Sequence, residues 1–433
     1  MKRGWLLRAL AIGSLCVAFA SNANALPTFA RKYRTSCTTC HVAIPKLNPF
    51  GEAFRKNGYQ IPGGQEAVYV KEEPVPLGAE AWKRVWPEAI WPGAIPETVP
   101  VSFRVQQRLR MQEHNTVSHA DLRFPSGFEM MSAGTLGEHI PFFGNFVFVD
   151  DAESSNTVET LQIGYYDLFS RWLGEHALNV KIGRMRIAAA DPLRETTQFF
   201  VTDPLPGSYT VGSSTFHLTD NFSAIELDGI LKRRFYWAAG VTNGEGGNQD
   251  VNDRKDLYYR LAYKLGGMAL DGSVGSGFGE GLGDTGGWTE TSLTVGTFGY
   301  FGRSTLGSQP DRFADPLHRI GADARLRFKN LDLVGAYVFG HDSNPSNGAT
   351  ATERLGVDSR SWIVQADYPI YPWWLVGFRT EGLTLNQAQN TVRYIPNMTV
   401  LLRANIRLSA EAVLNESEKG ATSQYLVDLL YVF

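Results

Sequence analysis

A short run near the N-terminus, Cys37-Thr38-Thr39-Cys40-His41, holds the residue types with the most specific chemistry in the chain. Two cysteines separated by two residues and followed directly by a histidine form the C-x-x-C-H pattern of c-type haem attachment. Each thiol can form a thioether with a vinyl group of the haem, and the imidazole can bind the iron as its proximal ligand. The run therefore predicts one covalent haem c held by Cys37, Cys40 and His41.

The distribution of cysteines agrees with export and haem attachment. Residues 1–25 have the layout of a secretory signal peptide, with three basic residues, an apolar core and an Ala23-Asn24-Ala25 cleavage site. The mature chain is expected to begin at Leu26, and Cys16 leaves with the signal. The two remaining cysteines both lie in the C-x-x-C-H run, so a disulfide framework is excluded by counting.

Composition narrows the class of protein further. The 433-residue chain has a formal net charge of −3, and losing the three positive charges of the signal takes it to −6, which gives no support for nucleic-acid binding. After the signal, no run of eighteen apolar residues predicts a transmembrane helix. Barrel strands alternate polar and apolar residues and need no such run, and 44 glycines with 12% aromatic residues suit that class.

The motif is expected to lie in a small helical segment, residues 26–65. Asn48 is a good helix N-cap, Pro49 fits the first helical position, and Gly58 is a helix stop. A helix this short needs an apolar surface to pack on, and a haem macrocycle would supply one. Arg55 and Lys56 are expected to face away from that surface. The side chains expected to pack on the haem are Phe50, Phe54 and Tyr59.

From residue 66 onward the composition and pattern of the sequence change twice. Residues 66–100 contain six prolines, which forbid a regular helix or a central strand, and are expected to form a linker. From Val101 the sequence alternates between apolar and polar residues, for example over 320–328 and 362–368. At about 21 residues for each strand and loop, residues 101–433 predict an antiparallel transmembrane barrel of about sixteen strands.

The last nine residues carry a second barrel signal, an alternating strand that ends on phenylalanine. Outer-membrane barrels commonly end in this way, with the closing strand presented to the assembly machinery. The predicted fold is therefore mainly β, an outer-membrane barrel in contact with lipid and preceded by a helical monohaem segment. The residues of this expected assembly signal are Tyr425, Val427, Leu429, Tyr431 and Phe433.

These features together resemble a known family, the fused outer-membrane cytochrome–porins, which include iron-oxidising cytochromes. The match runs over 37–41, 45–51 and 54–59, while 178–187 and 396–433 resemble porins in texture. The resemblance implies electron transfer between an extracellular donor, Fe(II) foremost, and a periplasmic carrier such as a cytochrome. It leaves open whether the chain acts as an Fe(II) oxidase or works outward to reduce extracellular acceptors.

Other classes of function remain in view. A diffusion porin with a structural or regulatory haem plug is the main alternative. A zinc site would need a spaced second pair of ligands, and a thioredoxin-type role would need a surrounding βαβ pattern; neither accompanies the motif. Acidic loop residues that could hold an iron substrate are Glu245, Asp250 and Asp253.

The distal ligand of the expected iron is not evident, because residues 26–98 contain no methionine and no histidine except His41. The segment is also too small to form a good free-standing domain, whereas a barrel of this size has a lumen to fill. We therefore expect it to fold into the barrel as a plug. The candidate distal ligands are Tyr33, Lys46, Met111, His114, His119, Met130, Met131 and His139.

Overall fold

The structure is a computed structural model, and it describes residues 28–433 with gaps. The gaps are 63–65, 72, 74, 77–81, 86–93, 98, 115–116, 138, 152, 245–251, 274–288, 309, 347–354, 387–389 and 419. The expected signal peptide lies outside the described residues, as do parts of the expected linker. No helix in the described part of the chain is long and apolar enough to cross a membrane.

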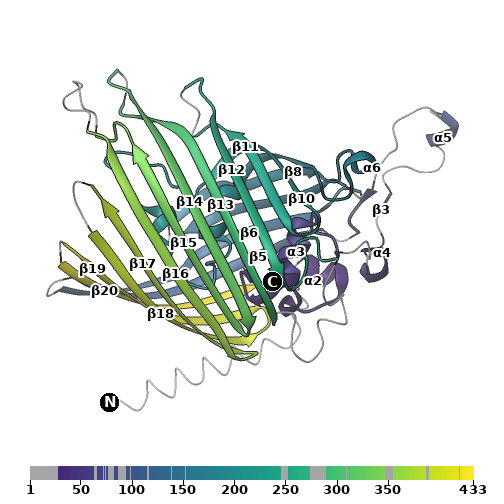
Figure 1. Cartoon of the computed structure of the whole chain (residues 1–433). Helices are drawn as coiled ribbons and strands as arrows, with labels where there is room; N and C mark the ends of the chain where they lie inside the picture. The colour runs from purple at the N-terminus through teal and green to yellow at the C-terminus, as the bar shows by residue number, and fades with distance from the viewer. Residues whose placement is uncertain are drawn as a thin grey trace, which may run out of the picture.

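Sixteen antiparallel strands close into one barrel, in which β20 pairs with β5 (Figure 1). The predicted mainly β barrel and its strand number are both confirmed. The strands are β5 (Val101–His114), β6 (Val117–Thr135), β7 (Pro141–Asp150), β8 (Glu153–Tyr165), β9 (Asn179–Arg186), β10 (Asn221–Leu231), β11 (Phe235–Thr242), β12 (Asp256–Gly266), β13 (Glu290–Leu306), β14 (Phe313–Lys329), β15 (Leu331–Asp342), β16 (Val357–Tyr371), β17 (Trp374–Leu385), β18 (Asn390–Arg403), β19 (Ile406–Ser417) and β20 (Gly420–Val432).

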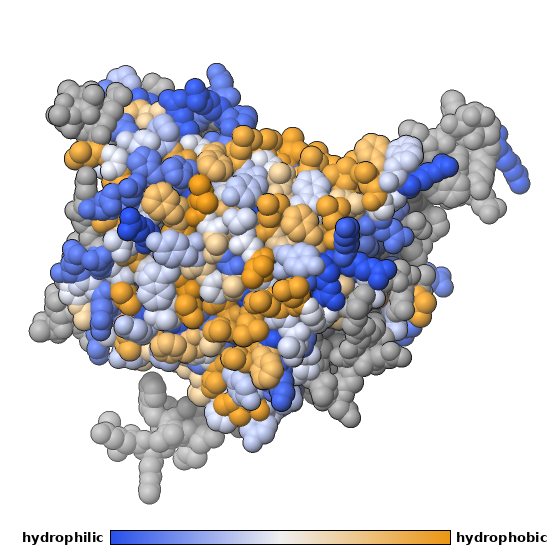
Figure 2. Space-filling view, viewed as in Figure 1, coloured by the Kyte–Doolittle hydropathy of each residue, from blue (hydrophilic) through white to orange (hydrophobic). Residues whose placement is uncertain are grey.

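The barrel wall forms because each strand is apolar on one face and polar on the other. On β14 the exposed residues include Ile320, Leu326 and Phe328, whereas Arg325 and Arg327 are buried on the lumen side. Figure 2 shows apolar side chains spread over the strands of the wall. An apolar exterior around a closed barrel suits lipid on all sides, so the protein is an outer-membrane β-barrel.

One long loop folds into the lumen rather than away from it. Residues 187–220 connect β9 to β10 and contain η3 (Ala188–Ala190), α7 (Asp191–Arg194) and α8 (Leu205–Ser208). Leu193 and Phe216 of this loop join the lumen faces of β10 to β16 in an apolar core that includes Phe222, Tyr300 and Ile363. The loop therefore fills part of the barrel with apolar side chains.

The N-terminal segment also lies in the barrel, at the end where the barrel begins and ends. Cys37 packs against Leu430 and Val432 of β20, and the short helices lie beside the C-terminus (Figure 1). The elements before the barrel are α2 (Thr28–Tyr33), η2 (Cys37–Thr39), β1 (His41–Ala43), β2 (Lys46–Leu47), α3 (Pro49–Lys56), α4 (Glu66–Tyr69), β3 (Val75–Pro76), α5 (Trp82–Val85) and β4 (Ala94–Ile95).

Helix α3 is the helix that the sequence predicts. Pro49 is its first residue, the Asn48 side chain accepts a hydrogen bond from the Gly51 N–H at 2.8 Å, and Gly58 follows its end with φ +67°. Only glycine adopts that left-handed conformation without strain, which explains the stop.

Candidate functional site

The C-x-x-C-H run is held in shape by a neighbouring asparagine. Cys37 to Thr39 form a single 3₁₀ turn. The fully buried Asn48 amide donates to the carbonyls of Thr38 and Thr39, at 3.2 and 2.9 Å, while its oxygen caps α3. One side chain therefore fixes the helix against the motif. The sequence indicated only the cap.

Helix α3 crosses directly over the second cysteine. A Cβ atom added at Gly51 would lie 2.1 Å from the carbonyl oxygen of Cys40. No heavy-atom contact of that length is possible, so the close approach of the helix to the motif requires glycine at this position.

The histidine of the motif is oriented by its other ring nitrogen. His41 Nδ1 lies 3.0 Å from the carbonyl oxygen of Pro45. Because a carbonyl can only accept, Nδ1 donates and Nε2 keeps the lone pair that can bind a metal. Burial lowers the pKa of His41, which favours the same neutral form. The imidazole is therefore preset as a metal ligand through Nε2.

Burial shifts the pKa of the two thiols in the opposite direction to the pKa of His41. It raises the pKa of Cys37 and raises the pKa of Cys40 to about 12. The thiolate is the form that binds zinc and attacks disulfides. A buried neutral thiol is a poor nucleophile, which disfavours the thiol-redox alternative.

A cavity of about 350 Å³ opens beside the motif, in the size range of small-molecule and cofactor sites. Cys37, Cys40 and His41 line it together with aromatic side chains of the segment and of the barrel wall. Tyr59 stacks between Phe29 and Phe143, with ring centroids 5.5 and 6.1 Å apart. The predicted aromatic residues Phe50, Phe54 and Tyr59 all line this cavity.

The part of the cavity that β9 and β10 line is charged. Lys181 of β9 pairs with Glu226 and Asp228 of β10, at 2.9 and 2.6 Å. Arg55 and Lys56 line this cavity too, so the expectation that they face elsewhere was wrong. They end a helix of eight residues, and their long side chains reach past the aromatic face.

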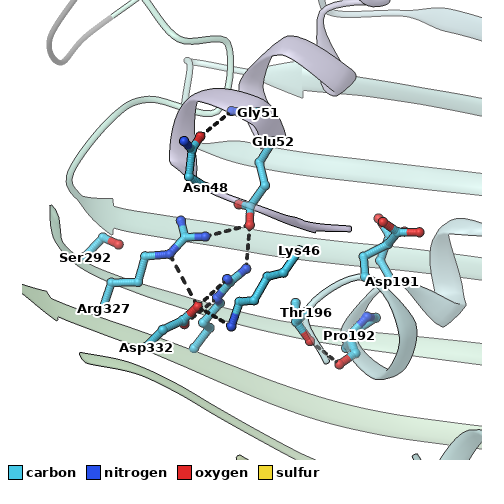
Figure 3. Close-up of polar contacts among 12 residues, drawn as sticks. Lys46, Asn48, Gly51, Glu52, Asp191, Pro192, Thr196, Ser292, Arg327 and Asp332 are labelled. Carbon is cyan, nitrogen blue, oxygen red and sulfur yellow. Dashed lines mark hydrogen bonds and ion pairs between the residues drawn. The ribbon is translucent and has the colours of Figure 1, made fainter. Parts of the chain in front are cut away.

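Ion pairs fasten the segment to the lumen wall (Figure 3). Glu52 of α3 accepts from Arg325 and Arg327 of β14, each at 2.6 Å. The almost fully buried Lys46 contacts Asp332 at 2.8 Å and also Asp367. These four partners point inward from β14, β15 and β16. The segment thus has the plug arrangement that we expected.

The pKa of Glu52 reflects this pairing. Burial acts to raise the pKa of the carboxyl, but the charges of Arg325 and Arg327 outweigh it and hold the pKa well below its usual range. Glu52 is therefore ionised at neutral and mildly acidic pH.

The candidate distal ligands are scattered. Tyr33 and Met131 line the cavity, and the Tyr33 hydroxyl donates to Glu66 at 2.9 Å. Lys46 is occupied by its two aspartates. Met111, His119 and His139 are exposed, Met130 is outside the cavity lining, and the His114 side chain lies outside the described residues.

Of the acidic loop residues proposed to hold an iron substrate, Asp253 is exposed, and Glu245 and Asp250 lie outside the described residues.

The closing strand has the alternation that the sequence predicts. Tyr425 and Val427 of β20 are exposed outward, whereas Leu426, Leu430 and Val432 are buried inside. Phe433 pairs with Phe103 of β5 through two backbone hydrogen bonds of 2.7 and 3.0 Å. The role of this strand as an assembly signal remains a prediction.

The barrel is similar to solved structures of outer-membrane proteins. An anion-selective porin from Comamonas acidovorans matches with a TM-score of 0.55 at 10% identity, covering 77% of this chain and 98% of that chain. OmpF of Salmonella typhi in complex with daunomycin matches with a TM-score of 0.51 at 12% identity, covering 77% of this chain and 97% of that chain. The trimer form of OmpT of Vibrio cholerae matches with a TM-score of 0.50 at 11% identity, covering 77% of this chain and 99% of that chain.

Comparison by sequence adds no relative: no protein-family model and no curated protein matches this chain. Identities of 10–12% show the fold alone. The chain has a porin-type barrel.

Proposed function

We propose that this protein is an outer-membrane electron-transfer protein of the cytochrome–porin type. One haem c would be bound through Cys37, Cys40 and His41, and electrons would pass between extracellular Fe(II) and a periplasmic carrier. The observation that carries the proposal is the cavity beside the motif, where both thiols, an imidazole oriented to bind through Nε2, and three aromatic side chains meet. The donor set and the apolar lining both fit a haem.

The chain's own residues would divide the work. Cys37 and Cys40 would anchor the macrocycle covalently, and His41 would hold the iron. Phe50, Phe54 and Tyr59 would cover the macrocycle and keep water from it. A bound haem would supply a centre that accepts and releases one electron at a time.

The position of the cavity in the barrel suits the transfer of electrons across the membrane. We take the side with the barrel's two chain ends as periplasmic, and the plug lies there. Asn145 of β7 lines the cavity, and β7 ends five residues later at Asp150 on the other side. Five strand residues span at most about 17 Å. The part of the cavity lined by β7 thus lies within about 17 Å of the outer end of that strand.

A diffusion porin is the second candidate, and the porin-type fold favours it. The observation against it is the loop 187–220, which packs apolar side chains against the lumen faces of β10 to β16 and so narrows the path for hydrated solutes. Fold alone does not decide function, so the two candidates call for a direct test.

Reduction of the haem by Fe(II) tests the proposal. The full chain is expressed in a host that attaches c-type haem and reconstituted in liposomes that enclose an electron acceptor. Each Fe(II) oxidised outside should reduce the enclosed acceptor by one electron. His41→Ala should abolish this transfer while the barrel still assembles, because the iron loses its oriented ligand.

His139→Ala is the matched control, since His139 is exposed and outside the cavity lining. Covalent haem, followed by haem stain on a denaturing gel, should be present in the wild type and in the control. Absence of haem from the wild type, or transfer that persists in His41→Ala, would refute the proposal. Solute flux unaffected by redox poise, together with no electron transfer, would favour the diffusion porin.

A further inference from the structure

The two ends of the cavity have different chemistry, and a haem has two different edges. Its vinyl groups lie on one side of the macrocycle, and its two propionate carboxylates lie on the opposite side. A haem attached through both vinyl groups to Cys37 and Cys40 has its vinyl edge fixed at the motif. Its propionates would then lie toward the end of the cavity away from the cysteines.

The barrel strands define which end that is. Ser102, Met131 and Val432, from β5, β6 and β20, line the cavity where Cys37 packs. Lys181 of β9 and Tyr236 of β11 line the cavity as well, and they come from another part of the wall. Lys181 and Arg186 of β9 lie there together with Arg55 and Lys56 at the end of α3, whereas Arg104 of β5 lies at the cysteine end.

Five cationic side chains line the cavity, and four of them have a carboxylate partner. Arg55 pairs with Glu195 at 2.8 Å, Arg186 with Glu195 at 3.3 Å, Lys181 with Asp228 at 2.6 Å, and Arg104 with Glu129. These charges are compensated within the protein.

Lys56 differs from the other four. Within the described parts of the chain no acidic side chain forms an ion pair with it, and its ammonium lies over the Tyr236 ring, 3.8 Å from the centroid. The residue is only partly exposed. An ammonium group withdrawn from water is costly unless an anion compensates it. The lining thus offers, among its described residues, one ammonium group without an ion-pair partner where the propionates are expected.

We propose that Lys56 forms an ion pair with a propionate of the haem attached to Cys37 and Cys40, and so positions the haem and tunes its reduction potential. The inference rests on the proposed function, since it requires the haem. A positive charge beside the macrocycle favours the form with the extra electron. Removing that charge should therefore lower the midpoint potential.

Redox titration of the purified full chain tests this role. Lys56→Met keeps the length of the side chain and removes its charge, and Lys56→Arg restores the charge. The control is Lys71→Met, because Lys71 is exposed and absent from the cavity lining. At the wild-type midpoint, Lys56→Met should reduce the ratio of reduced to oxidised haem about tenfold, which corresponds to about 59 mV for one electron. Lys56→Arg and Lys71→Met should stay at the wild-type midpoint.

An unchanged midpoint in Lys56→Met would overturn the inference and leave the proposed function intact. A wild type without covalent haem would instead overturn the proposed function. Folding of each variant is checked by its heat-modifiable mobility on a gel. If Lys56→Met fails to fold, Lys56→Gln supplies the same comparison, and a midpoint equal to that of the wild type overturns the inference.

Discussion

At the scale of single residues, the motif region depends on side chains that the motif itself does not contain. The Asn48 amide caps α3 through its oxygen and holds the turn of the motif through its nitrogen. Gly51 allows α3 to lie against Cys40. The motif supplies the bonding groups, and these two residues supply its shape.

Gly51→Ala tests that claim. The added methyl group would lie 2.1 Å from the Cys40 carbonyl oxygen, so α3 or the motif must shift. Overpacking of this kind costs about 1–3 kcal/mol or more. We expect less covalent haem on a haem-stained gel, with the barrel still assembled. Gly335→Ala is the control, because the nearest atom to its added methyl group, the Ile363 carbonyl oxygen, would be 3.8 Å away. Equal haem content in the two variants would contradict the role of Gly51.

At the scale of elements, local sequence patterns predicted well what local physics determines. Strands such as β14 were evident because lipid requires an apolar outer face on alternate residues. Helix α3 was evident because its cap, Pro49 and Gly58 are all local signals. No local pattern marks the loop 187–220, because its apolar residues meet their partners only once the barrel is closed.

The docking of α3 was likewise beyond local patterns. Glu52 meets Arg325 and Arg327, more than 270 residues later in the chain. No spacing rule connects an eight-residue helix to a distant strand. The motif and its aromatic side chains could therefore be predicted, whereas the anchors of the plug and the role of Lys56 could not.

Glu52→Gln tests how strongly α3 is docked. The variant keeps the shape of the side chain and loses its charge, while Arg325 keeps Asp332 and Arg327 keeps Glu290. A hydrogen bond to a charged group contributes about 1.5–3 kcal/mol, so we expect about 2 kcal/mol less docking stability. Protease cleavage within residues 28–61 should then be about 25-fold faster at pH 7, since 1.4 kcal/mol is tenfold. A cleavage rate equal to that of the wild type would show that the anchor contributes little.

The same pair predicts a pH dependence. The folded-state pKa of Glu52 is depressed, so its stabilising contribution is complete above the ordinary pKa of about 4.3 and is lost as pH falls toward the folded value. In the wild type, cleavage within the plug should not change between pH 7 and 5 through this group. The difference between the wild type and Glu52→Gln should shrink only below roughly pH 4.

At the scale of the whole molecule, two separate segments occupy the lumen of a porin-type barrel. The plug enters from the side of the chain ends, and the loop 187–220 follows a strand that ends on the opposite side. The wall resembles porins, whereas the interior contains an apolar core and an aromatic cavity. An outer-membrane protein that moves electrons needs a wall to hold its cofactor and no open path for solutes.

This architecture predicts the conductance of the protein in planar bilayers. The wild type should conduct poorly, because plug and loop together obstruct the lumen. Deleting residues 28–61 should raise the single-channel conductance severalfold, because the polar side chains of β14 to β16 then line an open entrance. Deleting the exposed helix α6 (Ser170–Leu173) is the control and should change nothing. A wild type that conducts as well as the plug-deleted protein would mean that the lumen is open with the plug in place, and the diffusion porin would then be the better account of this barrel.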